Sequence, residues 1–302
     1  MPPITAQAQR DGLTAAVAAY VIWGFFPLMF LQLSGVDPVL IVAHRIVWSL
    51  VVVGSILVLR NRLGEVSQAL RDPQVLWRLG ASTIFVGINW LTYVWAVENN
   101  RVLETSFGYF LNPLVNVLLG IVLLGERQNR WQWVAILIAA VAMVLQTIGL
   151  NGFPWLAVVI AVTFALYGYM RKTVKVSSAP GLFIETLLLM PLSVAYIIYT
   201  VVAHGAGPHA SAHGWFWLIF TGPATSLTLL LFAFGVQRLR LTTIGIIQYI
   251  APSIQRVLAV TVLSEELNSM RLLSFALIWL SLAVFTVDSV RRHRASLAAP
   301  QT

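Results

Sequence analysis

Apolar residues occur along this chain in long runs, and short polar segments separate the runs. We count ten such runs of roughly 20 residues, the length that an α-helix needs to cross about 30 Å of hydrocarbon at about 1.5 Å per residue. The predicted helices cover residues 13–33, 39–59, 79–97, 103–124, 131–149, 154–170, 181–203, 214–236, 242–263 and 271–290. The pattern therefore predicts an all-α membrane protein with ten transmembrane helices.

The apolar segment that ends at Glu126 is repeated later in the chain. At a constant offset of 139 residues, Pro113 aligns with Pro252 and Glu126 aligns with Glu265. One more long apolar run follows each copy. A period near half the length of an apolar chain is typical of transporters that are built from two related halves. We therefore expect two repeats of five helices each.

These repeats are expected to cover residues 13–149 and 154–290. Because five is an odd number of crossings, the second repeat enters the membrane in the opposite direction, which makes a 5+5 inverted-topology repeat. Of the 19 Lys and Arg residues, fifteen fall in segments on one side of the membrane and two on the other. The positive-inside rule therefore puts both termini in the cytoplasm, with residues 1–12 and 291–302 as tails and the second tail basic.

The composition is typical of a chain whose main partner is the lipid bilayer of a cell membrane. Hydrophobic residues make up 59% of its 302 positions and charged residues only 10%, whereas soluble domains carry about 25% charged residues. The net charge of +8 follows from the asymmetry between the two sides, so we expect no nucleic-acid partner. The chain has no cysteine, which excludes disulfides and thiolate metal sites.

Two connections between predicted helices are longer than the rest. The first, from Asn61 to Arg78, is expected to be solvated. The second contains His204, His209 and His213, which could form a metal cluster. Its HGAGPHASAH sequence is turn-like and offers no fixed ligand geometry, so we interpret these residues as loop histidines. We expect neither a metal nor a cofactor.

A stripe of polar side chains runs along one face of the fourth predicted helix. By their spacing, the residues that share this face are Thr105, Tyr109, Asn112 and Asn116. In the second repeat, Gln248 and Gln255 follow the same stripe beside Pro252. Kinked helices at matching positions of two repeats indicate a binding site at the membrane midplane. The alternative is that these amides only join helices, but because the stripe recurs we favour a cavity.

Aromatic and amide residues on two other helices are further candidates for solute binding. They are Tyr20 and Trp23 on the first predicted helix, and Asn89 and Tyr93 on the third. Aromatic rings with one polar tip suit a pocket for an organic solute, although interfacial anchoring and packing explain most aromatic residues of such a chain. Pro27, like Pro113 and Pro252, is expected to break its helix and to permit gating.

Four ionisable residues lie inside predicted helices, where a charge costs at least about 2.5–3.5 kcal/mol. They are His44, Arg45, Glu185 and Arg256. Arg45 could bind a substrate carboxylate or pair with Glu185, and His44 and Glu185 could carry a proton. The structural alternatives are an interhelical ion pair without a role in transport and a side chain that extends to the membrane interface.

Two glutamates, Glu126 and Glu265, end helices, where the helix dipole disfavours a negative charge. Arg127 and Arg130 could compensate Glu126. We therefore expect a structural clamp or a gating contact at these glutamates rather than a substrate site.

Several motifs of the chain resemble the RarD group, an EamA-type branch of the drug/metabolite transporter superfamily. They include HRIVWS at residues 44–49, INWLTYVWAV at 88–97, ETSFGYFLNPLVNVLLG at 104–120 and RLRLTTIGIIQYIAP at 238–252. The resemblance covers nearly the whole chain. It implies a five-plus-five inverted repeat in which the first four helices of each repeat surround a central cavity, and a permease linked to chloramphenicol sensitivity. Arg256 and Ser264 depart from the apolar or aromatic residue and the glycine that the resemblance leads us to expect.

The sequence is best explained by a secondary transporter that moves a small organic metabolite or an amphipathic drug across the cytoplasmic membrane by alternating access. A membrane enzyme is the alternative from another class, but the chain has no HExxH, no GxSxG and no acidic metal cluster. A channel-like facilitator usually gathers identical groups around an axis, unlike this asymmetric polar set. A homodimer is left open.

Overall fold

The computed structural model describes residues 5–99, 101–147, 154–262 and 269–298, and these residues form helices joined by short connections without any strand. The helices are α1 (Ala6–Leu31), α2 (Pro38–Leu59), α3 (Leu63–Arg71), α4 (Pro73–Glu98), α5 (Val102–Leu124), α6 (Arg130–Thr147), α7 (Trp155–Thr173), α8 (Ser178–His204), η1 (Gly207–Ala210), α9 (Ala212–Arg238), α10 (Leu241–Gln248), α11 (Ile250–Thr261) and α12 (Ser269–Ala298).

Six of the described helices are long and apolar enough to cross a membrane, namely α1, α2, α5, α7, α8 and α9. Shorter apolar segments occur in α6 and α12. Because the side chains that face outward are also largely apolar, as at Leu192, Val202 and Leu137, water would be an unfavourable surrounding for this bundle. The expectation of an all-α membrane protein is therefore confirmed at this level.

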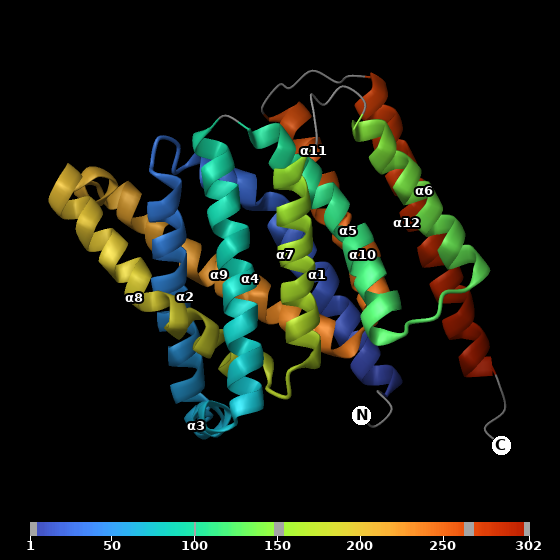
Figure 1. Cartoon of the computed structure of the whole chain (residues 1–302), viewed down its shortest axis with the longest axis horizontal. Coiled ribbons are helices and arrows are strands. Elements are labelled where there is room, and N and C mark those ends of the chain that lie inside the picture. The colour runs from blue at the N-terminus through green and yellow to red at the C-terminus, as the bar shows by residue number, and fades with distance from the viewer. Residues whose placement is uncertain (1–4, 100, 148–153, 263–268, 299–302) are drawn as a thin grey trace.

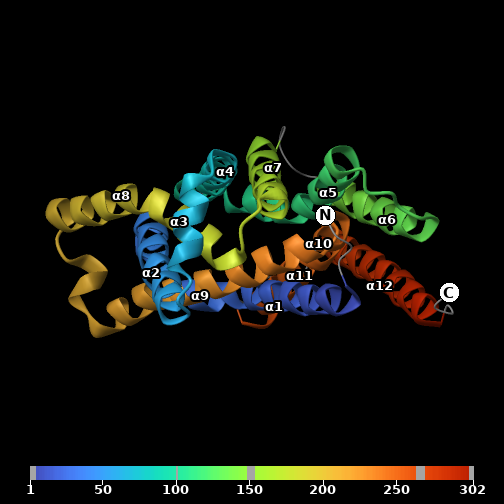
Figure 2. The ribbon, with the colours of Figure 1, turned by 90° about the horizontal axis from the view of Figure 1, so that it is seen from below.

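The helices lie in two layers (Figure 2). One layer holds α8, α4, α7, α5 and α6, and the other holds α9, α1, α10, α11 and α12. Helices α6 and α12 pack mainly against each other and form one edge of the molecule, opposite α8 (Figure 1). The start of α1 and the end of α12 lie at the same end of the bundle as α3 (Figure 1). We call this end the α3 end and the opposite end, which carries η1, the η1 end.

Local sequence signals explain where several helices begin and end. The Asp37 carboxylate accepts a hydrogen bond of 2.8 Å from the Val39 amide, and Pro38 occupies the first position of α2, where its missing N–H costs nothing. Helix α5 ends at Gly125, whose φ of 63° is a left-handed conformation that favours glycine. These local signals account for the entry to α2 and the exit from α5 without a tertiary contact.

The helices α5 and α10 cross at very short distance near the middle of the bundle. A Cβ atom at Gly245 would lie 2.6 Å from the backbone oxygen of Pro113 and 3.2 Å from the Asn116 Cβ atom. Only glycine leaves room for this approach, because the nearest atom belongs to the backbone and cannot rotate away. The crossing brings the polar faces of the two helices together.

The predicted helix 242–263 consists of α10 and α11, which meet at Tyr249. This break agrees with the one expected at Pro252, whose ring removes a hydrogen bond to the preceding turn. Two other expectations about local structure were wrong. Helix α1 continues past Pro27 and α5 continues past Pro113, so these prolines do not end their helices. The connection 61–78 contains α3, an amphipathic helix that buries Val66 and Ala69.

The predicted tails also contain helical residues. Helix α1 begins at Ala6, inside the segment 1–12, and α12 continues to Ala298, inside the segment 291–302. Both extensions are polar helix ends that continue an apolar helix without a break, which hydropathy alone does not separate from a loop.

Candidate functional site

A cluster of buried amides lies where α1, α5 and α10 meet. The Asn116 Nδ2 atom donates to Gln248 Oε1 at 2.9 Å and to Asn112 Oδ1 at 3.0 Å. The Tyr20 hydroxyl donates to the same Gln248 oxygen at 3.4 Å. The structure therefore joins four of the residues that the sequence analysis proposed for solute binding, from both predicted repeats.

These amides are closed on each other in this structure. Asn112 and Asn116 are each only 1% exposed, and the Asn112 Nδ2 atom donates to the Ala161 oxygen of α7 at 2.7 Å. Asn89 likewise donates to the Ile160 oxygen at 2.8 Å, and Gln255 donates to the Trp23 oxygen at 3.2 Å. In this conformation the amides join helices, and among their fully buried atoms in the described part of the chain only Asn116 Oδ1 has no hydrogen bond.

The aromatic candidates divide between two places. Trp23 packs near Tyr20, with ring centroids 5.4 Å apart, and near Phe164, at 5.9 Å, so it belongs to an aromatic cluster beside the amides. Tyr93 and Tyr109 instead lie together, with centroids 6.2 Å apart, and both are only partly buried. They mark a second group of candidate residues, around Arg45.

The side chain of Arg45 lies among aromatic rings between the two layers of helices. Its guanidinium carbon is 5.1 Å from the centroid of Trp90 and 5.8 Å from that of Phe30. Its Nε atom donates to the Thr225 hydroxyl at 3.0 Å, and Tyr93 and Tyr109 lie close to its guanidinium group. We call the set formed by Arg45 with Phe30, Trp90, Tyr93, Tyr109 and Thr225 the Arg45 site; it draws on α1, α2, α4, α5 and α9.

No carboxylate of the described residues forms an ion pair with Arg45. Its two terminal nitrogens form no hydrogen bond to these residues either, and they remain accessible because the side chain is only partly buried. The pairing of Arg45 with Glu185 that the sequence left open is wrong, since Glu185 binds another arginine. Phe30, Trp90 and Thr225 were missed, because apolar and small polar residues carry no signal that distinguishes them from packing.

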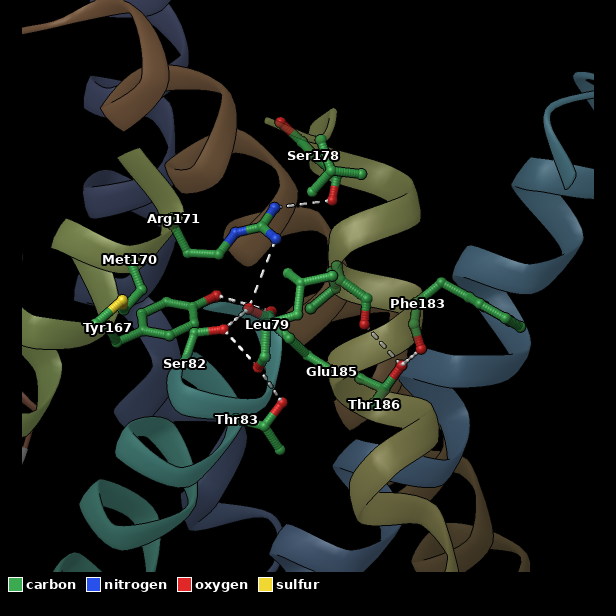
Figure 3. A network of polar contacts seen from close by, with 12 residues as sticks. Leu79, Ser82, Thr83, Tyr167, Met170, Arg171, Ser178, Phe183, Glu185 and Thr186 are labelled. Carbon is green, nitrogen blue, oxygen red and sulfur yellow. Dashed lines mark hydrogen bonds and ion pairs between the residues drawn. The ribbon is translucent and has the colours of Figure 1, made fainter. Parts of the chain in front are cut away.

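Glu185 belongs to a buried network between α4, α7 and α8 (Figure 3). Its Oε1 atom lies 3.6 Å from Arg171 Nη1, and the two side chains are 3% and 0% exposed. The carboxylate also accepts hydrogen bonds from Ser82 and from the Tyr167 hydroxyl. Figure 3 shows these four side chains pointing toward one another. A buried carboxylate with a cation and two hydroxyl donors is well compensated.

Arg171 follows directly after the predicted helix 154–170, but the structure places it inside the bundle near the end of α7. Its Nη2 atom donates to the Ser178 oxygen at 3.0 Å, and a Cβ atom at position 181 would lie 2.0 Å from its Nη1 atom. Gly181 thus makes space for the guanidinium. The sequence does not indicate which of the basic residues that follow Tyr167 points into the bundle.

His44 connects α2 to η1 at the η1 end. Its Nδ1 atom accepts a hydrogen bond from Trp48 Nε1 at 3.3 Å, and its Nε2 atom lies 2.8 Å from His209 Nε2. The His209 Nδ1 atom is 2.9 Å from the Ala206 oxygen. The segment around His209 was expected to have no fixed geometry, which is wrong: it forms η1 and holds this contact. The described residues contain no group of three or more metal-ligating side chains.

The carboxylate of Glu126 caps the N-terminus of α10. It accepts hydrogen bonds from the Leu241 amide at 2.6 Å, the Thr242 amide at 3.0 Å and the Thr242 hydroxyl at 2.5 Å. Arg240 lies 3.7 Å away. The expected compensation by Arg127 and Arg130 is therefore wrong, because the charge is stabilised by the start of another helix, where the dipole favours it. Glu265 and the side chain of Arg256 lie outside the described residues.

The α3 end carries another polar contact, between α3 and the start of α8. Arg62 donates to Glu65 at 2.5 Å and 2.9 Å, and Ser177 donates to the same carboxylate at 2.7 Å. The hydrogen bond from Arg62 and then that from Ser177 hold the pKa of Glu65 below its usual value. The carboxylate therefore remains charged at neutral pH and keeps the contact.

Comparison with known proteins agrees with a transporter. Residues 10–148 match the EamA-like transporter family. An uncharacterized transporter of Pseudomonas aeruginosa is 38% identical over 290 residues, with 94% of this chain and 96% of the relative covered. A RarD protein of Salmonella typhi is 37% identical over 292 residues, with 96% and 99% covered. A solved crystal structure of a protein that is 21% identical has a TM-score of 0.71 and covers 95% of this chain and 98% of that one, which shows a shared fold.

The fold and these relatives define the class of the chain as a multi-pass membrane transporter of the drug/metabolite superfamily. Because its identity to RarD proteins extends over nearly the full length, the chain belongs to the RarD-type branch of the EamA-like family. Relatives in Pseudomonas aeruginosa and Vibrio cholerae are named as transporters, which is consistent with a protein that is not an enzyme.

Proposed function

We propose that this protein is a secondary transporter that carries a small organic solute, a metabolite or an amphipathic drug, by alternating access between two inverted repeats. The observation that carries the proposal is Arg45, an accessible cation inside an apolar bundle, surrounded by helices of both repeats. A charge in such a place is costly unless it has a function. The amide cluster around Asn116 would form the deeper part of the path that the solute follows through the bundle.

The packing of the helices supports a five-plus-five repeat. In this scheme the first repeat consists of α1, α2, α4, α5 and α6. Their counterparts in the second repeat are, in the same order, α7, α8, α9, α10 with α11, and α12. Helix α1 packs against α9 as α7 packs against α4, and α5 packs against α7 as α11 packs against α1. When the two repeats are exchanged, the contacting pairs α2–α8, α5–α10 and α6–α12 remain unchanged. Contacts that pair in this way are expected of two related halves.

The distribution of basic residues gives the proposed orientation. The α3 end carries Arg62, Arg127 and Arg240 among other cations, so by the positive-inside rule it faces the cytoplasm, with both termini on that side of the cell membrane. Contacts between the repeats are numerous there, including the cap of α10 by Glu126 and the bond from Arg78 to the Thr173 oxygen. We therefore interpret this conformation as closed toward the cytoplasm.

The proposal is tested by counterflow in proteoliposomes that contain the purified protein. A panel of radiolabelled aromatic acids, amino acids and amphipathic drugs is offered against the same unlabelled compound inside. A carrier is expected to give saturable, transient accumulation of at least one of them, which liposomes without protein do not give. Linear, unsaturable flux would indicate a channel, and chemical conversion of a compound would indicate an enzyme; either result contradicts the proposal.

The contact between His44 and His209 supports a role for protons in this cycle. Because Trp48 donates to His44 Nδ1, the proton of a neutral His44 lies on Nε2 and is donated to His209 Nε2, and His209 Nδ1–H is donated to Ala206. All donors and acceptors are then used. Protonation of His209 puts a hydrogen on both facing Nε2 atoms, which breaks the contact and releases η1 from α2. Protonation of His44 instead puts a hydrogen on its Nδ1 atom, which breaks the hydrogen bond from Trp48.

Other ionisable groups on the neighbouring elements are engaged elsewhere. Asp37 accepts from Tyr196, Arg45 donates to Thr225, His204 packs on Tyr199, and His213 packs on Trp217. None of these contacts places a carboxylate against the histidine pair, so no described anion stabilises the protonated form. The pair is therefore expected to separate as the pH falls.

A distance measurement tests this expectation. The chain has no cysteine, so spin labels can be attached to introduced cysteines, as in Leu31→Cys with Ala210→Cys, without further changes. Lowering the pH from about 8 to about 4, which extends below the range in which an exposed histidine titrates, is expected to lengthen or broaden the distance. His44→Gln should abolish the response, whereas the control His213→Gln should retain it. A response that survives in His44→Gln would contradict the role of the pair.

A further inference from the structure

We propose that the Arg45 site selects solutes that carry one anionic group, such as a carboxylate, on a flat apolar body. This inference rests on the proposed transport function, because it assigns the class of solute to the same site. It is carried by the free edge of the guanidinium and by the rings that surround it.

The charge of the site favours an anion. Arg45 has no carboxylate partner among the described residues, and its Nε atom alone is occupied, by Thr225. Its two terminal nitrogens therefore remain as a planar pair of donors, which is the geometry that binds a carboxylate with two parallel hydrogen bonds. In an apolar surrounding this interaction is strong, and a cationic solute would be repelled.

The orientation of Arg45 agrees with a ligand inside the bundle. Arg45 is the eighth residue of α2, roughly 10 Å from the start of that helix at about 1.5 Å per residue. Its partner Thr225 is the fourteenth residue of α9, which also starts at the η1 end. The side chain thus reaches deeper into the bundle instead of extending to the interface.

A comparison with Arg171 separates a binding role from a structural one. Arg171 is 0% exposed, has a carboxylate at 3.6 Å and fills the space left by Gly181. Arg45 is only partly buried and has accessible nitrogens. The Nε and Nη1 atoms of Arg171 also lack a hydrogen bond among the described residues, but they are fully buried. The two inward-facing arginines therefore differ in the feature that ligand binding requires, which is a donor edge that a solute can reach.

The rings around Arg45 define the body of the solute. Trp90 and Phe30 lie 5.1 Å and 5.8 Å from the guanidinium carbon, and cation–π contacts of this kind hold the guanidinium in place. Tyr93 and Tyr109 are partly buried, lie 6.2 Å apart and present polar tips on apolar rings. A flat aromatic or unsaturated acid has the surface that packs on such rings while its carboxylate meets Arg45.

The test measures binding rather than transport. Two sets of matched compounds are titrated against the purified protein, and the melting temperature gives the apparent Kd. The first set is benzoate, benzamide and benzylamine, and the second is indole-3-acetate, indole-3-acetamide and tryptamine. The acids are expected to bind at least about tenfold more tightly than their neutral and cationic counterparts. Arg45→Gln should remove this preference, whereas Arg101→Gln, which deletes another arginine at the η1 end, should retain it.

A second variant keeps the inference testable if Arg45→Gln does not fold. Arg45→Lys keeps the charge but loses the planar pair of donors, so it is expected to bind the acids with an affinity between those of the wild type and Arg45→Gln. Equal affinity for acids and amides, acid binding by Arg45→Gln at the wild-type level, or no binding of either acid would each overturn the inference. Acid binding through Arg45 without counterflow would instead refute the transport function alone.

Discussion

Glu185→Ala is expected to lower the free energy of unfolding by about 3–5 kcal/mol, because it leaves Arg171 as a buried charge without a partner. The guanidinium is 0% exposed and has Glu185 as its only described carboxylate neighbour, at 3.6 Å. The Tyr167 hydroxyl would lose its acceptor at the same time, and the Ser82 hydroxyl would keep only the Leu79 backbone oxygen, at 2.9 Å. Thermal unfolding in detergent, or titration with a denaturant, measures the loss.

The double variant Arg171→Met with Glu185→Leu is the matched control for this prediction. Both charges are then removed and apolar side chains of similar size replace them, which is often neutral or stabilising. We expect the double variant to be far more stable than Glu185→Ala, so that the coupling between the two sites is large. If the double variant lost as much stability as Arg171→Met and Glu185→Leu together, the broken ion pair would not be the cause of the loss in Glu185→Ala.

The helices themselves could be predicted because each of them is an apolar run of sufficient length. Hydropathy determines which segments leave water, and a membrane helix must satisfy its backbone groups internally. The same signal did not reveal α3, whose apolar residues Val66 and Ala69 are too few to form a run. Hydropathy also did not separate α10 from α11, since the break at Tyr249 interrupts the backbone without interrupting the apolar sequence. That break was indicated by Pro252 instead.

Partners inside the bundle could not be predicted, because a sequence gives the depth of a residue in the membrane but not the direction in which it points. Arg45 and Glu185 are each the eighth residue of their helices, α2 and α8, which start at opposite ends of the bundle. They therefore lie near opposite ends. Glu185 instead pairs with Arg171, which is followed by two further cations, Lys172 and Lys175. The sequence therefore did not indicate which cation is its partner.

The amides illustrate a second limit of sequence patterns. The spacing of Asn112 and Asn116 correctly placed them on one face, and Gln248 does meet that face. The pattern could not show whether the face lines a cavity or joins helices, since both require the same residues. In this conformation Asn112 binds the backbone of α7, and a cycle of alternating access would need these bonds to exchange as the repeats move.

The contrast between the two ends of the bundle has a consequence for the proposed cycle. The Glu185 network at the α3 end is electrically complete, and Arg45 toward the η1 end is not. An anionic solute would complete the second site and leave both ends compensated. Since a ligand shifts a conformational equilibrium only through its differential affinity, such a solute would favour the conformations in which the guanidinium is covered.

Gly245→Ala is expected to destabilise the protein by about 1–3 kcal/mol, because it overpacks the crossing of α5 and α10. The new Cβ atom would lie 2.6 Å from the Pro113 oxygen, so the two helices must separate. Separation would lengthen the hydrogen bond of 2.9 Å between Asn116 and Gln248. The same change at Gly80, inside α4, meets no atom within 4 Å and is expected to stabilise by roughly 0.5–1 kcal/mol through helix propensity. Opposite signs of the two shifts in unfolding free energy would confirm a crossing that requires glycine; a stabilising Gly245→Ala would show that α5 and α10 are not in close contact.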